Sequence, residues 1–527
     1  MATYDLLTEP WIPVRGPDGV TRELGLLDVL KQAHDLVEVT DPAPPFELGI
    51  YRLLIAFVLD ALRLEELDDL VERLAAGRFD AAELMAYVDR VGRRRFDLFD
   101  TGHPFLQSAS GTGDRELDTV AMLFHHLPTG LIHFHHQLAD QHAVSAAVCA
   151  RALCSIAPFM TAGGRGYSPS INGTPPWYLL IRGNRLFETI LLNCYVLSDL
   201  GLPGNTPVAW RDDQPVEQVE LACGSLLEGL TWRARWVRLI PAEGGPCTYS
   251  GKHADFRVSR IHFGPGFMFR GGARGWTDPA VAYRMTDNGR SPIRPEEDRE
   301  LWRDTGPLLL LRQEDHSGEK GRVAFTRPLI AEQFRWMKER GYLSPAILED
   351  RFDVYGMRTD KCKVFEWYHE RLALDPRVGS QPRAGLLVRQ AMDLAESVAY
   401  ALGRALKVAY PRNAASNGRA FDRLIQVAQA RFWSDLRLEF ERQYLPTLAG
   451  LDPADPNAEA QLCADWKAAV SGVGRRALDD ATRPLDVDAK ALLRRVACVQ
   501  AFSGALWALL NPAAAASKKK ERGKKKV

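Results

Sequence analysis

The sequence predicts an α+β protein in which a large mixed α/β N-terminal domain, residues 1–375, precedes a C-terminal four-helix bundle, residues 385–512. Up to about residue 375, short β-type runs alternate with Gly and Pro turns. After about residue 381, apolar residues recur at the spacing of amphipathic helices. The length of 527 residues is ample for a large core and for more than one domain.

The N-terminal domain is expected to combine short strands with one clear early helix. This helix extends from Phe46 to about Leu62 and has a wide apolar face. A charged, proline-punctuated segment, residues 278–304, indicates a surface excursion. The strand-like apolar runs are residues 177–181, 232–240 and 307–311.

Four apolar stripes at helical spacing predict the C-terminal bundle. The first stripe stops at Pro411, a residue that a helix interior does not tolerate. Helices with short or moderate connections pack naturally as an up-and-down bundle, so the stripes indicate core packing rather than a cofactor site. They cover residues 387–409, 421–436, 462–477 and 492–510.

The composition is that of an ordinary soluble protein, with 46% apolar and 25% charged residues. Lys+Arg and Asp+Glu both number 67, so any contact with nucleic acid must come from local patches. The eight cysteines form no CxxC pair, which favours free thiols in a reducing cytosol. We find no signal peptide and no apolar run of about 20 residues, and therefore expect a cytoplasmic protein without a membrane span.

The C-terminal tail, residues 513–527, is predicted to be disordered. Seven of the nine residues 518–526 are basic. Such a segment is either a solvated end or an electrostatic arm that follows phosphates.

The segment Phe159–Asn193 is the most informative of the chain. Its first half has glycines at positions 163, 164, 166 and 173 and prolines at positions 169, 175 and 176. Glycine lets a backbone approach another surface without a Cβ in the way. Because Arg165 adds positive charge at the same place, the loop is suited to lie against a narrow, electronegative surface.

Six of the twelve histidines fall between positions 125 and 142, with Asp140 beside them. Together with the dipeptide His34-Asp35, they raise the alternative of an HD-like metal-dependent nuclease or phosphohydrolase. The other interpretation is a polar loop or a set of RNA-contacting histidines. The sequence contains no HExxH, P-loop or GxSxG motif. We therefore expect no enzyme activity, no cofactor and no metal.

Several short motifs occur in an order that resembles the CasA family, the large subunit of the type I-E CRISPR surveillance complex Cascade. Each motif is weak alone, but their order and spacing together extend over nearly the whole chain. They are Leu7–Val14, His103–Gln107, the glycine loop, Gly173-Thr174-Pro175, Arg182-Gly183, Leu191–Asn193 and Gly229–Trp232.

The resemblance implies a non-enzymatic subunit that recognises the protospacer-adjacent motif in duplex DNA. It also implies that the chain promotes strand opening for guide-RNA pairing and helps recruit the target-degrading helicase–nuclease. The implied partners are the other Cascade subunits, the 5′ handle of the guide RNA, target double-stranded DNA and that helicase–nuclease. Some relatives carry a CxxC-like cluster near Cys247; this chain does not, so a zinc site is not expected.

The resemblance also implies where RNA is bound. The loop that contacts the guide handle corresponds to residues 134–145, with Phe134 as the stacking residue. An alternative for Phe134 is a core position on a strand of alternating His and Phe. The expected RNA-binding residues are Phe134, His135, His136 and Gln137.

Three segments are implied to contact DNA: the glycine loop, a basic finger and a wedge. The lysine that the family carries in its finger is not reproduced near 267–270. The wedge, which opens the first base pair in the family, has no glutamine here; the alternative for this segment is a charge-rich, solvated loop. Minor-groove readout is degenerate, so a short and permissive motif is expected. The expected DNA-binding residues are Ala162, Gly163, Gly164, Arg165 and Gly166 in the loop, Arg270 and Arg274 in the finger, and Arg358, Thr359, Asp360, Lys361 and Lys363 in the wedge.

Overall fold

The structure is a computed structural model in which the chain divides into two compact units. The first unit comprises Met1–Glu297 and Gly318–Ala373, and the second comprises Asp298–Ser317 and Leu374–Val527. The second unit therefore includes a segment that the sequence placed with the N-terminal domain. The structure describes residues 2–108, 116–127, 142–163, 166–197, 200–270, 275–286, 289–297, 299–310, 325–343, 350–360, 363–375, 377–378, 381, 383–410, 418–452, 455, 457–512 and 514.

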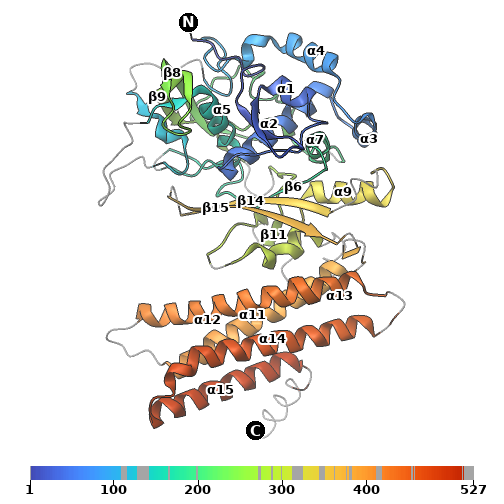
Figure 1. Ribbon diagram of the computed structural model, residues 1–527, viewed down its shortest axis with the longest axis vertical. Coiled ribbons are helices and arrows are strands. Elements are labelled where there is room, and N and C mark those ends of the chain that lie inside the picture. Colours follow the sequence, from blue (N-terminus) through green and yellow to red (C-terminus); the bar gives the residue numbers. More distant parts are fainter. Residues whose placement is uncertain are drawn as a thin grey trace. The chain divides into compact units, whose positions relative to one another are not determined.

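Helix α2, Pro44–Leu62, forms the centre of the first unit (Figure 1). It begins with prolines in its first turn and is buried from Pro45 to Asp60, so it is a core helix rather than an amphipathic surface helix. Helices α4, α5, α6, α7 and α8 and strand β14 pack around it. The other helices of this unit are α1 (Leu26–Lys31), α3 (Leu67–Ala76), α4 (Ala81–Val91), α5 (Ala146–Cys154), α6 (Ile156–Phe159), α7 (Leu186–Leu192), α8 (Leu226–Leu230) and α9 (Leu329–Glu339).

The strands of the first unit form several small sheets. One has the order β15-β14-β6 and joins β6 (Tyr178–Ile181) to the hairpin β14 (Asp350–Asp360) and β15 (Lys363–Leu374). Another contains the long antiparallel pair β8 (Arg235–Pro246) and β9 (His253–Pro265), with β4 (Asp118–Thr119) and β5 (Val144–Ser145) on β9. The remaining strands are β1 (Ile12–Arg15), β2 (Thr21–Leu24), β3 (Glu38–Val39), β7 (Glu220–Leu221), β10 (Met268–Phe269), β11 (Tyr283–Thr286), β12 (Gly289–Pro292) and β13 (Phe325–Thr326).

The second unit is a helical bundle, as predicted (Figure 1). Its four long helices are α11 (Ala384–Ala409), α12 (Gly418–Glu439), α14 (Ala458–Thr482) and α15 (Ala489–Leu510), with the short helix α13 (Leu445–Ala449) after α12. The turn η5, Leu301–Asp304, adds Trp302 to the bundle core. The ring centroid of Trp302 lies 5.9 Å from that of Trp433 and 5.3 Å from that of Phe440.

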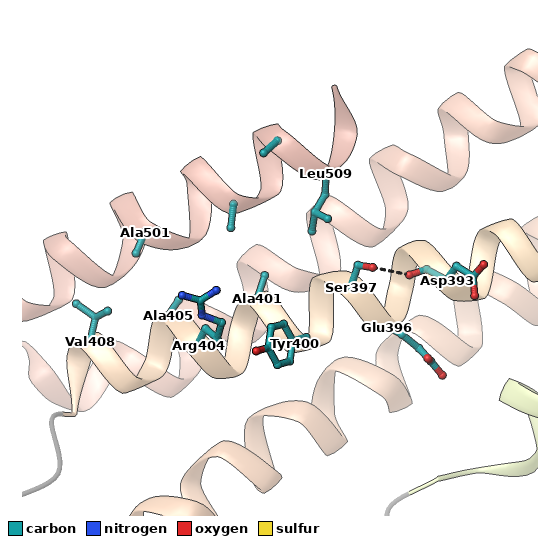
Figure 2. Close-up of a pocket in the computed structure, with 12 residues that line it drawn as sticks. Asp393, Glu396, Ser397, Tyr400, Ala401, Arg404, Ala405, Val408, Ala501 and Leu509 are labelled. Carbon is teal, nitrogen blue, oxygen red and sulfur yellow. Dashed lines mark hydrogen bonds between the residues drawn. The ribbon is translucent and has the colours of Figure 1, made fainter. Parts of the chain in front are cut away.

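A groove of about 890 Å³ lies between α11 and α15 within this unit (Figure 2). Tyr400, Arg404 and Val408 of α11 line one side, and alanines and Leu509 of α15 line the other. Tyr400 is 68% exposed there.

Several predicted elements need correction. Residues 307–310 are no strand, because Gly306–Leu310 form a π-helical turn, η6; residue 311 lies outside the described residues. The segment 278–304 is no simple surface excursion: Asp278 is fully buried, and β11 and β12 pair with each other. The strand predicted at 232–240 begins only at Arg235 and continues to Pro246. The basic tail lies outside the described residues except for Ala514.

Among the described residues, no helix combines the length and the apolar character that crossing a lipid bilayer requires.

Candidate nucleic-acid interface

The glycine loop is held at both ends by one buried arginine, Arg235 of β8. Its guanidinium donates to the carbonyl oxygen of Thr161 before the loop, and to that of Ser168 after it at 2.6 Å. It also lies over the ring of Tyr167, 5.2 Å from the centroid. Burial lowers the pKa of Arg235 to about 10, so the group still carries its charge at neutral pH. Arg235 therefore holds the two ends of the glycine loop close together.

Within the loop, the structure describes Ala162, Gly163 and Gly166, whereas Gly164 and Arg165 lie outside the described residues. Gly163 is exposed, and its amide donates to the carbonyl oxygen of Tyr167 at 3.3 Å. Gly166 has a φ of +87°, which other residues adopt only with strain. The loop thus presents backbone rather than side chains at the positions that are described.

A buried polar network fixes the chain after the loop. The Asn172 amide donates to Asp278 at 2.8 Å, and the Trp276 indole donates to Asn172 at 2.8 Å. Arg52 of α2 pairs with Asp278 at 2.9 Å, and both side chains are buried. A buried polar group without a partner destabilises the folded state, so these hydrogen bonds fix the segment that leads from the loop to β6.

The glycine loop lies beside the segment that leads to the basic finger. A Cβ on Gly166 would come within 2.8 Å of the Gln218 amide nitrogen, so the two residues are in contact. Strand β7 begins two residues after Gln218 and pairs in parallel with β10. The amide of Arg270, the residue after β10, donates to the carbonyl oxygen of Leu221 at 2.7 Å. The exposed Arg270 is thereby tied to the loop, whereas Arg274 lies outside the described residues.

The predicted wedge is the end of a β-hairpin, not a free loop. Arg358, Thr359 and Asp360 end β14 and Lys363 begins β15, while Lys361 lies outside the described residues. The pairing of β14 with β6 covers only Phe352–Tyr355, so the hairpin continues past the edge of β6. Arg358 pairs with Glu366 at 3.1 Å and with Glu297 at 3.7 Å. These two carboxylates therefore neutralise part of the positive charge of Arg358.

The base of this hairpin is anchored to α2 by buried charged groups. The Tyr355 hydroxyl donates to Glu47 at 2.6 Å, and its ring stacks on His369 with centroids 4.4 Å apart. His369 lies 3.3 Å from Asp353, and Arg182 pairs with the same carboxylate at 3.1 Å. Burial raises the pKa of the Glu47 carboxyl.

The three residues Glu47, Asp353 and His369 form the one group of potential metal ligands found in the described part of the chain. Protein donors already bind both of its carboxylates, because Tyr355 and the Asp41 amide bind Glu47 and Arg182 binds one oxygen of Asp353. This arrangement suits a network that orients the hairpin. His34 and Asp35, which suggested the HD-like alternative, do not belong to it; they contact each other at 3.4 Å.

The predicted RNA-binding residues Phe134, His135, His136 and Gln137 lie outside the described residues. The chain before them is well packed: His125 Nε2 lies 3.1 Å from the Ser155 hydroxyl, and the His126 ring contacts Tyr249 and Trp367. His125 and His126 are thus a hydrogen-bonding and a packing group, respectively. The seven described cysteines are free thiols, as the sequence indicated.

Sequence reasoning missed Arg235 and Gln218, the two side chains that position the glycine loop. Arg235 stands within an apolar strand, where its charge gives no hint of a partner 67 residues earlier. Gln218 lies in a polar stretch without a pattern. A contact between distant segments was the missing information in both cases.

Comparison with known proteins identifies the family of the chain. Residues 5–477 match the family model described as CRISPR-associated protein Cse1. The chain is 28% identical over 429 residues to the CRISPR-associated protein CasA/Cse1 of Thermus thermophilus, covering 77% of this chain and 76% of that protein.

Solved structures with the same fold include two named relatives. T. thermophilus CasA (Cse1) aligns with a TM-score of 0.72 at 23% identity, covering 96% of this chain and 99% of that one. Thermobifida fusca Cse1 aligns with a TM-score of 0.74 at 21% identity, covering 96% and 98%. A chain of a structure described as a CRISPR RNA-guided surveillance complex aligns with a TM-score of 0.73 at 19% identity, covering 96% and 100%. The extent of the family match and the shared fold lead to one conclusion: the chain belongs to the CRISPR-associated Cse1 (CasA) family.

Proposed function

We propose that this chain acts by binding rather than by catalysis, as the large subunit of a type I-E CRISPR surveillance complex. In this role it recognises the motif beside a target in duplex DNA, starts strand opening for guide-RNA pairing, and helps recruit the helicase–nuclease. Membership of the Cse1 family supports the assignment, as does the fold shared with a chain of a CRISPR RNA-guided surveillance complex.

The observation that supports DNA recognition most strongly is the joining of the glycine loop to the finger. Exposed backbone at Gly163 and the exposed cation of Arg270 belong to segments connected through Gln218 and the β7–β10 pair. Backbone without side chains allows close approach, and arginine is attracted to a narrow minor groove. Together they fit the minor groove of a short duplex.

Strand opening is assigned to the hairpin β14–β15. Its end carries Arg358 and Lys363 beside the small polar residues Thr359 and Asp360. Parting a base pair costs a few kcal/mol of unstacking, and an inserted side chain offsets part of that cost. The buried network around Tyr355 and His369 gives the hairpin a rigid base from which to act.

Substitutions in the glycine loop test this proposal. Gly163→Val with Gly164→Val should weaken binding to a target with a good flanking motif by about tenfold or more, equivalent to ~1.4 kcal/mol. The complex should still assemble with guide RNA, because a Cβ on Gly163 would meet Tyr167 only at an ordinary contact distance of 3.4 Å. Gly504→Val is the control, since its Cβ would point into open space on α15. Unchanged target affinity in the double variant would reject the assignment of the loop.

A further inference from the structure

One face of β15 carries a row of alternating side chains that are aromatic or basic. On a regular strand, every second side chain points to the same face. The ring contacts agree with this alternation: Trp367 meets His126 with centroids 4.8 Å apart, whereas the next residue, Tyr368, meets Trp177 at 5.2 Å. The row consists of Lys363, Phe365, Trp367, His369 and Arg371.

The row is packed at His369 and open at Phe365 and Lys363. His369 is packed against Glu47 and Asp353, and Trp367 is half-buried. Phe365 is 52% exposed, and the Arg358 guanidinium lies 5.0 Å from the centroid of its ring. A large ring this exposed contributes little to the core and is available to a ligand.

Two rings from other segments extend the surface of Trp367. His126 precedes the predicted handle loop, and Tyr249 lies in the turn between β8 and β9; their centroids are 5.5 Å apart. Both side chains are at least partly exposed, and the buried rings of Phe46 and Phe124 support them from behind. We call Phe365, Trp367, His126 and Tyr249 the β15 aromatic platform.

We infer that the β15 aromatic platform binds the unpaired bases of a single-stranded nucleic acid. Aromatic rings stack on the face of any base, and flanking cations hold the phosphates. Lys363 stands at the open end of the row and supplies such a cation, whereas Arg371 at the other end already pairs with Glu38 at 2.7 Å. Glu366 and Glu370 alternate to the other face. A duplex would bind the β15 aromatic platform poorly, because its bases are already stacked on one another.

The spacing of the row fits an unstacked strand. Side chains two positions apart on a strand are separated by about 6.6 Å. This is about twice the rise of 3.4 Å per nucleotide in stacked DNA. Phe365 and Trp367 can therefore each take one base of an extended strand.

This inference rests on the proposed function, which gives two sources of unpaired bases. One is the guide-RNA handle, because His126 stands just before the loop predicted to contact it. The other is the target strand parted at the end of the hairpin, which Phe365 adjoins. Both sources present the same chemistry, and RNA and DNA probes distinguish them.

The test measures binding of the full chain to labelled oligonucleotides of about 10 residues, within the usual site size of ~4–16 nucleotides. The probes are single-stranded DNA, single-stranded RNA of the same sequence, and the DNA duplex. Phe365→Ala should weaken single-strand binding about 5- to 150-fold, the range that one stacked base contributes. Phe365→Trp should restore it, whereas Phe365→Leu should behave like the alanine variant. Tyr400→Ala, which removes an exposed ring from α11, is the control and should have no effect.

A preference for RNA would identify the handle as the source, and a preference for DNA the parted strand. The inference is overturned if the wild-type chain binds no single strand, if Phe365→Ala weakens duplex binding as much as single-strand binding, or if Phe365→Ala matches the control. These outcomes are separable from failure of the proposed function, because the glycine-loop variants are measured on duplex targets with the assembled complex.

Discussion

Replacing Arg235 by methionine tests how the glycine loop is held. The side chain is 4% exposed and donates to two carbonyl groups that flank the loop, those of Thr161 and Ser168. Methionine fills a similar volume but offers no donor. Both carbonyl groups then lose the donor that satisfies them.

The expected loss follows from these two groups. A buried polar group left without a partner costs about 1–3 kcal/mol, so two cost about 2–6 kcal/mol. Relief of the buried charge offsets part of this. We therefore expect the free energy of unfolding to fall by about 2–4 kcal/mol. Arg238→Met is the matched control on the same strand: its half-buried side chain donates to one carbonyl, that of Asp100 at 3.0 Å. That change should cost about 1 kcal/mol.

The assay is urea unfolding with linear extrapolation, together with hydrogen exchange of the loop amides. In the Arg235 variant, the amides of Gly163 and Ser170 should exchange faster, because their acceptors, Tyr167 and Met160, belong to the loosened segment. In the Arg238 variant they should keep their rates. If both variants lose the same stability and the loop amides exchange at wild-type rates in each, Arg235 does not fix the loop.

Two further changes test other parts of the chain. Trp302→Ala should lower the unfolding free energy of the full chain by about 3–5 kcal/mol, because the ring is buried against Trp433 and Phe440. In denaturant unfolding, the control Trp507→Ala should lose clearly less stability, because the Trp507 side chain is exposed. Equal losses would contradict the packing described. Burial, followed by the nearby charges of His126 and Arg235, lowers the pKa of His125 from 6.5 to about 3. The folded state binds that proton less readily than the unfolded state, so stability is full above about pH 6.5 and falls as the pH drops towards 3, by up to ~2 kcal/mol at pH 5. His125→Gln, which keeps a donor for Ser155, should flatten this part of the pH profile, and an unchanged slope would rule out His125 as its source.

Local patterns predicted the helical parts of the fold well. The helix expected at Phe46–Leu62 is α2, and the four apolar stripes correspond to α11, α12, α14 and α15. Each pattern lies within one segment and follows one period, so no distant contact is needed to recognise it. The run 307–311 was misassigned for the opposite reason, because five apolar residues have no period that separates a strand from a helical turn.

The candidate site could be predicted only in outline. Motif order indicated the glycine loop and the wedge, but the attachment of the wedge hairpin to β6 depends on pairing between Leu179 and Val354, which are far apart in sequence. The hydrogen bond of Arg235 to Ser168 and the contact of Gln218 with Gly166 also join residues that are far apart in sequence, so no local pattern reveals them. The β15 aromatic platform did leave a partial signal, since Phe365 and Trp367 stand two positions apart just after Lys363.

The long separation between β6 and its partner strand bears on how the chain folds during synthesis. Tyr178 pairs with Tyr355, so 177 further residues must be made before the pair can close. At about 5–20 residues per second, β6 waits roughly 9–35 s after it emerges. An apolar strand with an open edge is prone to wrong pairing during such an interval. Slower translation before residue 350 would lengthen this exposure, so the yield of folded protein should depend on codon choice in that stretch of the gene.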